Sequence, residues 1–259
     1  MTLVLLVRHG LTAVTGSVLS GWTPGVNLDE RGTAQAESLA TRLAPVPLDA
    51  IVSSPLERCV QTAAAIAAVR NSQAAAVQYD ERIGECRYGA WTNQPLKKLV
   101  KDPLWRVVQQ HPSAVRFPGP EGESMLDMQH RAVAAVRDWN ARLGRRATYV
   151  VCSHGDVIKA IAADALGMHL DLYQRIQVDP CSLTVIRYTP LRPFMIRMND
   201  TGGDVAGLIR GATQASTAQA STGASPDGQG SRGESDAMVG GSPGADLSAG
   251  MRITADARG

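Results

Sequence analysis

Two histidines in the sequence each follow an apolar segment and precede a glycine. His9 lies in the segment LLVRHG, and His154 lies in the segment VVCSHG. Continuous apolar runs of this kind are typical of strands buried on both faces of a sheet. Ligands of open α/β sheets bind beyond the carboxyl ends of such strands. If the two strands are neighbours, both imidazoles face one pocket.

Two arginines lie close to the same predicted edge. Arg8 directly precedes His9, and Arg58 lies in the segment SSPLERCVQT, on the first turns of a helix that follows a predicted strand. The amino-terminal end of a helix attracts anions, and guanidinium groups bind phosphate oxygens through charge-assisted hydrogen bonds. Two guanidiniums and two imidazoles around one point therefore predict a site for a dianionic phosphate group.

The elements that must position these side chains alternate along the chain. Apolar runs predict strands, and amphipathic segments with capping residues such as Asp29 and Ser124 predict helices. This alternation predicts an α/β fold, a three-layer α/β/α sandwich with a mostly parallel central sheet whose last strand or two run antiparallel. The predicted strands are residues 3–7, 50–53, 77–80, 148–153, 182–188 and 194–198, and the predicted helices are residues 30–43, 55–69, 96–110, 125–143 and 157–166.

Composition divides the chain near residue 200. The last 59 residues hold 13 of the 25 glycines and no Phe, Trp or Tyr. Such a segment cannot bury enough apolar surface to offset its ordering entropy. We therefore expect one catalytic domain over residues 1–199, and a disordered low-complexity tail over residues 200–259.

Charge and hydropathy exclude several classes of function. A formal net charge of +2 does not suit a sequence-blind nucleic-acid binder, which needs a basic excess on one face. No apolar run reaches the roughly 18 residues of a membrane-spanning helix, and the apolar N-terminal segment is too short for a signal peptide. The expected location is the cytoplasm, with neither nucleic acid nor membrane as a partner. The sequence carries no signal for an oligomeric state.

The four cysteines do not form a recognisable framework. They have no C-x-x-C spacing, which argues against a zinc site, and they are too sparse for a disulfide scaffold. Free cysteines are among the most often buried residues. We expect four reduced, mostly buried thiols, at Cys59, Cys86, Cys152 and Cys181.

Six motifs, in their order along residues 2–199, resemble those of the histidine phosphatase superfamily, in its phosphoglycerate-mutase-like branch. Each motif alone is weak, but all six in the right order are specific. They are Arg8-His9-Gly10-Leu11-Thr12; Gly21-Trp22 with Gly32-x-x-Gln35-Ala36; Ser53-x-Pro55-x-x-Arg58-x-x-x-Thr62; Glu85-x-x-x-Gly89-x-Trp91; Gly122-Glu123-Ser124; and Ser153-His154-Gly155.

The resemblance implies a role for each residue of the reaction centre. His9 is the nucleophile that becomes phosphorylated, and Glu85 is the general acid and base. Asp156 is a rival proton donor, although an acidic residue at this place more commonly sits at a helix N-terminus for its favourable interaction with the dipole. The phosphoryl oxygens are held by Arg8, Arg58 and His154.

Further residues are expected to contact the substrate. Residues 13–15 lack the Asn that often donates to the phosphate in the family, so Thr12, Ser20 or the backbone around Gly21 would take that role. Tyr88 lies beside the acid and is expected to touch the substrate. No metal ion or cofactor is implied, because the arginines act as the charge sink.

We therefore expect a metal-independent phosphatase that hydrolyses small phosphomonoesters through a phosphohistidine intermediate on His9. One alternative is a phosphoglycerate-type phosphomutase, but residues 92–122 lack the Arg-Arg pair that the mutase branch uses for the substrate carboxylate, holding only Arg106 and Arg116. The other is a non-catalytic phosphate-binding scaffold, which would be free to lose one of the catalytic residues. The sequence leaves the identity of the phosphate ester open.

Overall fold

The computed structural model describes residues 1–70, 76–202 and 240. At its centre lies a six-stranded sheet with the strand order β4-β3-β6-β1-β7-β8. The first four strands in this order run parallel, and β7 and β8 join antiparallel, as predicted. The strands are β1 (Thr2–Arg8), β3 (Ala50–Ser53), β4 (Val77–Tyr79), β6 (Thr148–Ser153), β7 (Leu183–Tyr188) and β8 (Pro193–Asp200).

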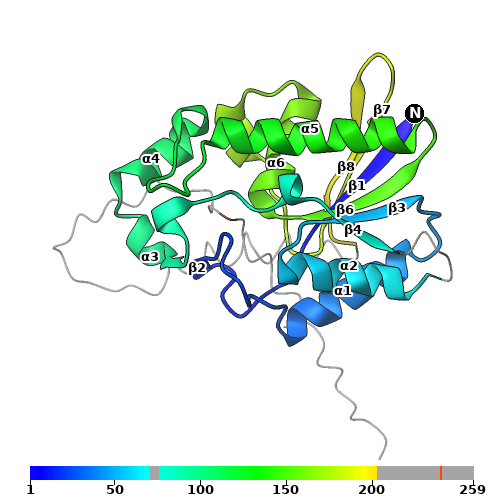
Figure 1. The fold of residues 1–259 in the computed structure, drawn as a ribbon, viewed down its shortest axis with the longest axis horizontal. Helices are drawn as coiled ribbons and strands as arrows, with labels where there is room; N and C mark the ends of the chain where they lie inside the picture. Colours follow the sequence, from blue (N-terminus) through cyan, green and yellow to red (C-terminus); the bar gives the residue numbers. More distant parts are fainter. Residues whose placement is uncertain (71–75, 203–239, 241–259) are drawn as a thin grey trace, which may run out of the picture.

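Helices cover both faces of the sheet and complete the predicted three layers. Figure 1 shows α1 (Glu30–Leu43) and α2 (Glu57–Ala68) on one face, and α5 (Met125–Leu143) and α6 (Gly155–Leu166) on the other. The side chain of Asp29 caps α1 by accepting from the Gly32 amide, and that of Ser124 caps α5 by accepting from the Asp127 amide. Side-chain caps of this kind satisfy amides that the first turn leaves without a partner.

Strand β1 contributes to the core on both sides of the sheet. Val4 and Leu6 belong to the apolar cluster under α5 and α6, and Leu5 and Val7 belong to the cluster under α1 and α2. Successive side chains of a strand point to opposite faces, so a strand covered on both sides has to be apolar throughout. This burial anchors the end of the strand at Arg8.

The predicted helix over residues 96–110 is wrong in one respect, because it is two helices. They are α3 (Leu96–Leu99) and α4 (Pro103–Gln110), with Asp102 capping α4. Proline has no amide to donate within a helix and is tolerated only in the first turn. Helix α2 also begins at Glu57 rather than at Pro55, and α6 begins at Gly155, two residues before the predicted start.

A second, two-stranded sheet was not predicted. It pairs β2 (Val18–Leu19) with β5 (Gln94–Pro95) in antiparallel fashion. Two-residue strands are too short to carry an alternating pattern. This small sheet lies beyond the end of the main sheet that is remote from the N-terminus, next to α3 (Figure 1).

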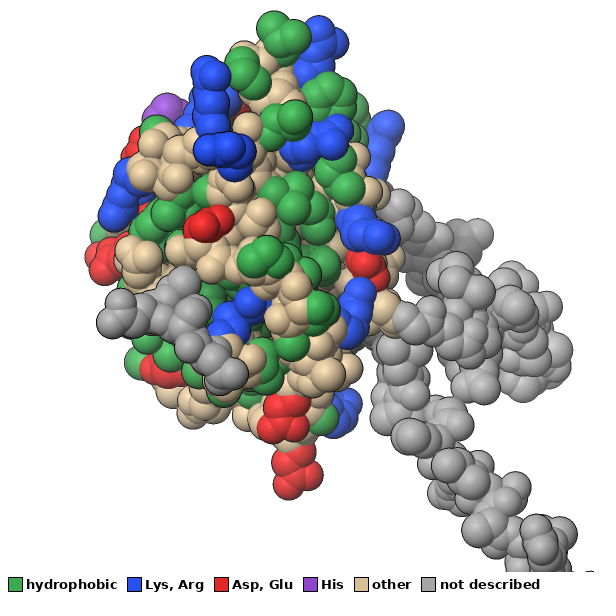
Figure 2. Space-filling view, turned by 90° about the vertical axis from the view of Figure 1, so that its right-hand side faces the viewer, with side chains coloured by type: hydrophobic (Ala, Val, Ile, Leu, Met, Phe, Trp, Pro, Cys, Tyr) green, Lys and Arg blue, Asp and Glu red, His purple; other side chains and the backbone are tan. Residues whose placement is uncertain are grey.

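Strand β8 extends to Asp200, and the domain boundary after residue 199 stays a prediction. Residues 203–239 and 241–259 of the predicted tail lie outside the described residues, so its disorder remains a prediction. On the face shown in Figure 2, Lys and Arg side chains are interspersed with hydrophobic and uncharged ones. Within residues 1–70, 76–202 and 240, no helix has the length and apolar character to cross a bilayer.

The loop after β1 packs directly on the start of α1. The Asp29 amide donates to the Leu11 carbonyl at 3.0 Å, and the Gln35 side chain accepts from the Leu11 amide at 3.1 Å. A Cβ atom on Gly32 would collide with the Leu11 backbone. Only glycine therefore lets the helix approach the loop that carries Gly10.

We predict that Gly32→Ala lowers the free energy of unfolding by about 1–3 kcal/mol, the usual cost of an overpacked site. Urea denaturation followed by circular dichroism measures it. Arg31→Ala is the control, because Arg31 is exposed beside the same contact and should change stability by less than about 0.5 kcal/mol. An unchanged midpoint for Gly32→Ala would contradict the close packing.

Candidate active site

His9 and His154 leave the sheet side by side. Strands β1 and β6 are parallel neighbours in a register that sets Arg8 opposite Ser153, and the His9 amide donates to the Ser153 carbonyl at 3.0 Å. The two ring centroids are 5.3 Å apart, with the rings inclined at 62°. The two matching motifs of the sequence therefore form one structural unit.

The His9 ring presents Nε2 to the pocket as an acceptor. Its Nδ1 lies 2.7 Å from the Gly10 carbonyl, which makes Nδ1 the protonated nitrogen of the neutral ring. Nε2 then accepts from Nε of Arg58 at 3.3 Å. Burial first, and then the charges of Arg58 and Arg8, hold the pKa of His9 well below its ordinary value. The imidazole is therefore neutral and nucleophilic near pH 7.

Two buried arginines line the pocket together with His9. Arg58 donates from Nη2 to the Gly21 carbonyl at 2.9 Å, while its buried Nη1 has no hydrogen-bond partner among the described residues. Arg8 donates from Nη1 to the Val178 carbonyl at 2.8 Å. Backbone carbonyls thus orient both guanidiniums beside His9. Guanidinium groups so placed can bind an anionic ligand through charge-assisted hydrogen bonds.

His154 lies behind His9 in a polar contact network. Its Nε2 is 2.8 Å from the Ser54 hydroxyl and 3.4 Å from Sγ of Cys59. Its Nδ1 is 3.7 Å from a carboxyl oxygen of Glu85. Burial, followed by the charge of Arg58, keeps the pKa of His154 well below its ordinary value.

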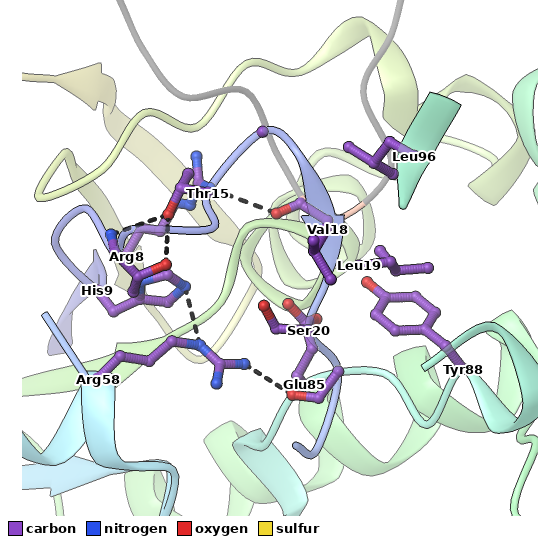
Figure 3. Close-up of a pocket in the computed structure, with 14 residues that line it drawn as sticks. Arg8, His9, Thr15, Val18, Leu19, Ser20, Arg58, Glu85, Tyr88 and Leu96 are labelled. Atoms are coloured by element: carbon purple, nitrogen blue, oxygen red, sulfur yellow. Dashed lines mark hydrogen bonds between the residues drawn. The ribbon is translucent and has the colours of Figure 1, made fainter. Parts of the chain in front are cut away.

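Glu85 carries the carboxyl group of the pocket wall. Burial raises its pKa to about 7, and the charge of Asp156 adds to this effect, against the opposing influence of Arg58. Figure 3 shows Arg8, His9 and Arg58 on one side of the pocket, with Glu85 and Tyr88 across it. A carboxyl group that titrates near neutrality can both donate and accept a proton in one catalytic cycle.

Arg131 of α5 holds the loop that carries Glu85. It donates from Nη1 to the carbonyls of Arg82 and Gly84 at 2.7 and 2.8 Å, and from Nη2 to the Glu85 carbonyl at 2.9 Å. An ion pair with Glu123 keeps the guanidinium in place. Sequence reasoning missed Arg131. The sequence pointed to it only through Glu123 of the Gly-Glu-Ser motif, because the motif does not indicate which cation pairs with Glu123.

The predicted substrate-contacting residues line one pocket, except for His154, which is fully buried behind His9. Thr12 bonds to the hydroxyl of Thr15 at 2.9 Å, so Thr15 is a second residue that sequence reasoning missed. Leu19 and Leu96 add an apolar patch to the pocket wall, opposite the arginines (Figure 3). The residues lining the pocket include Arg8, His9, Arg58 and Glu85 together with Thr12, Ser20, Gly21 and Tyr88.

The four cysteines are free and buried, as predicted. Cys59 lies nearest to the reaction centre, with Sγ 3.4 Å from the Ser153 carbonyl. Burial raises the pKa of the Cys59 thiol to about 12, although the Arg58 charge acts in the opposite direction. The thiol is therefore protonated at neutral pH.

A comparison of the chain with known families and proteins matches this geometry. The sequence profile of the histidine phosphatase superfamily (branch 1) matches residues 4–201. The chain belongs to this superfamily. The superfamily and the fold class predicted from the six motifs are thus confirmed.

Two curated relatives are named for different activities, one for a phosphatase and one for a mutase. Phosphoserine phosphatase 1 of Hydrogenobacter thermophilus is 30% identical over 212 residues, which cover 78% of this chain and 93% of the relative. A probable phosphoglycerate mutase of Yersinia pestis is 30% identical over 190 residues, which cover 73% of this chain and 86% of the relative.

Solved structures of the superfamily share the fold. Bacillus stearothermophilus YhfR superposes with a TM-score of 0.69 at 26% identity, covering 77% of this chain and 98% of that protein. Phosphoserine phosphatase of Entamoeba histolytica, in complex with 3-phosphoglyceric acid, superposes with a TM-score of 0.68 at 25% identity. The match covers 77% of this chain and 98% of that protein. Together with the profile match, these relatives support a phosphoric monoester hydrolase.

We predict that Arg131→Gln lowers kcat on an alkyl phosphate by about ten- to a hundredfold, because a small displacement of a catalytic group has effects of this size. KM should change little, since the arginines of the pocket stay in place. Arg137→Gln is the control: Arg137 lies on the same helix in an exposed ion pair with Asp164. Equal kcat for the two variants would show that Arg131 does not position Glu85.

Proposed function

We propose that this protein is a phosphatase that hydrolyses small phosphomonoesters without a metal ion, through a phosphohistidine on His9. The observation that carries the proposal is the neutral His9 ring, whose Nε2 accepts from the buried Arg58 in a pocket that the buried Arg8 also lines. A nucleophile at that point meets a phosphorus atom whose oxygens the arginines hold.

In the first step Nε2 of His9 forms a bond to phosphorus while the bond from phosphorus to the ester oxygen breaks. The electron pair of the broken bond stays on the leaving oxygen, which takes a proton from the Glu85 carboxyl group. The products are a phosphohistidine, a free alcohol and the Glu85 carboxylate. Arg8, Arg58 and His154 stabilise the charge that spreads over the phosphoryl oxygens.

In the second step water attacks the phosphohistidine. The Glu85 carboxylate takes a proton from the water, and the bond from phosphorus to Nε2 of His9 breaks. Inorganic phosphate leaves, and both His9 and Glu85 return to their starting states. Asp156 is buried in the first turn of α6 and bonded to the Tyr88 hydroxyl, so we assign the proton transfers to Glu85, which lines the pocket.

Hydrolysis is favoured over phosphoryl return to an alcohol. The cations among the described pocket-lining residues are Arg8 and Arg58, which the phosphate occupies, and neither Arg106 nor Arg116 lines the pocket. A phosphoglycerate-type mutase needs further cations to hold the substrate carboxylate while the phosphoenzyme waits. The small-molecule ester is the one partner that the proposal requires.

A cytoplasmic location fits this proposal. The four cysteines are free, and reduced thiols are typical of proteins that work in a reducing compartment. We propose that the enzyme acts there on metabolite phosphates.

We predict that kcat/KM for ethyl phosphate falls as the pH rises through about 7, because the raised pKa of Glu85 makes the donating form dominate below that pH and disappear above it. Hydrolysis of 4-nitrophenyl phosphate should fall far less over the same range, because nitrophenolate leaves without a proton. Glu85→Gln should remove the difference between the two pH profiles. It should also lower the rate of ethyl phosphate hydrolysis by about 10²- to 10⁴-fold. Parallel profiles in the wild type would contradict the assignment of Glu85.

We predict that His9→Ala lowers turnover of 4-nitrophenyl phosphate by more than about a hundredfold while the protein stays folded, since loss of a nucleophile normally has a far larger effect. The assay contains EDTA, so that activity in the wild type also tests metal independence. His111→Ala is the control, because that histidine is exposed and lies outside the pocket.

The intermediate itself is accessible to a trapping experiment. Wild type mixed with radiolabelled substrate and quenched in alkali should retain an acid-labile phosphoryl group on His9, and His9→Ala should retain none. A label that maps to another residue would refute the mechanism. If the enzyme converted labelled 3-phosphoglycerate into labelled 2-phosphoglycerate faster than it released phosphate, the protein would be a mutase instead.

A further inference from the structure

Helix α6 carries a buried ion pair next to the pocket. Asp156 is fully buried, and Lys159, one turn later, is 4% exposed, with 3.8 Å between Nζ and a carboxyl oxygen of Asp156. Lys159 also donates to the Gln174 side chain at 3.0 Å. Buried charges are expensive unless they are paired. The two-step reaction above uses neither group to transfer a proton.

The Asp156 carboxylate has one oxygen directed toward the pocket. Its Oδ2 accepts from the Tyr88 hydroxyl at 2.9 Å and from the Gly240 amide at 3.0 Å. Tyr88 and Gly240 both line the pocket. The other oxygen, Oδ1, is buried and has no hydrogen-bond partner among the residues described. Oδ1 instead faces Nζ of Lys159 at 3.8 Å, so a substrate hydroxyl would reach Oδ2 by taking the place of the Gly240 amide.

Gly240 shows what this part of the pocket can bind. Its amide donates to Asp156, and its carbonyl accepts from Nη2 of Arg8 at 3.3 Å. A single residue thus bridges the phosphate-binding arginine and the buried carboxylate. A substrate that occupies this place has to offer an acceptor to Arg8 and, a few bonds away, a donor to Asp156.

A phosphate ester with a nearby hydroxyl meets both requirements. A phosphoryl oxygen is the acceptor for Arg8, and the hydroxyl is the donor for Asp156. A carboxylate in the same place has no hydrogen atom to donate to Asp156. An ammonium group would gain little, because Lys159 already opposes the charge of Asp156, and it would lose its hydration.

We propose that Asp156 selects phosphomonoesters of polyhydric alcohols, by accepting a hydrogen bond from a substrate hydroxyl close to the ester bond. The carbon skeleton of the alcohol then lies against Leu19 and Leu96, which line the same pocket. This selection rests on the proposed phosphatase activity and names the class of ester that the site hydrolyses.

The test compares 2-hydroxyethyl phosphate with 2-methoxyethyl phosphate, two esters of alcohols of similar acidity that differ in the hydrogen-bond donor. The wild type should prefer the hydroxyl ester by tenfold or more in kcat/KM, because a site built to bind a hydroxyl discriminates strongly against its absence. Equal kcat/KM values would overturn the inference. So would a higher kcat/KM for 2-aminoethyl phosphate than for 2-hydroxyethyl phosphate.

A double variant, Asp156→Leu with Lys159→Met, assigns the preference to the carboxylate. Replacing both members of a buried ion pair avoids leaving one charge unpaired. The ratio of the two kcat/KM values should fall to about one. If Asp156 acted only through Glu85, the double variant would hydrolyse both esters more slowly by the same factor. The ratio of the two kcat/KM values would then stay unchanged, and this result would overturn the selection role.

Asp164→Asn is the matched control, because Asp164 lies on the same helix in an ion pair with Arg137 and should leave the ratio unchanged. Hydrolysis of 4-nitrophenyl phosphate is measured for every variant. A wild type inactive on all esters would refute the proposed function, whereas an active wild type without the hydroxyl preference would refute only the selection by Asp156.

Discussion

The site depends on the parallel pairing of β1 with β6. Backbone hydrogen bonds between these strands set the register in which Arg8 lies opposite Ser153, so His9 and His154 leave the sheet at the same level. A shift of one residue would turn one histidine toward the opposite face of the sheet. The helices on both faces disfavour that shift, because it would exchange β1 side chains of different shape between the two close-packed core clusters.

Burial then gives each ionisable group of the site its protonation state. The interior disfavours charge, so the two histidines stay neutral and Glu85 keeps its proton to a higher pH than an exposed carboxyl group would. Backbone carbonyls orient the two arginine side chains, and a guanidinium group keeps its proton in proteins. The result is a positive pocket with a neutral nucleophile, which matches the charge of a phosphate dianion.

Most of the fold could be predicted from the sequence, because its signals are local. The apolar run before His9, the Asp29 cap and the Ser124 cap each mark an element through neighbouring residues. The break of the helix at Pro103 follows from the same local rules, because proline is tolerated only in the first turn of a helix. The two-stranded sheet of β2 and β5 carries no pattern of its own, since its pairing depends on residues distant in sequence.

The candidate site followed from strand ends and motifs, whereas its supporting contacts did not. Nothing in the sequence around Arg131 indicates that it holds the backbone of the Glu85 loop, because backbone carbonyls have no sequence signature. The position of Gly240 between Arg8 and Asp156 is equally invisible in a glycine-rich segment. Contacts of this kind arise from the folded path of the chain, and only a structure displays them.

The burial of Cys59 bears on the selectivity of the phosphoryl transfer. A thiolate is a stronger nucleophile than an imidazole, and Cys59 lies 3.4 Å from His154. With its pKa raised to about 12, only about one Cys59 side chain in 10⁵ is ionised at pH 7. The fold thus places the Cys59 thiol beside the reaction centre and, by burying it, keeps it protonated and unreactive. A phosphorus atom bound at His9 therefore meets no Cys59 thiolate, and no dead-end phosphocysteine at that residue competes with the phosphohistidine.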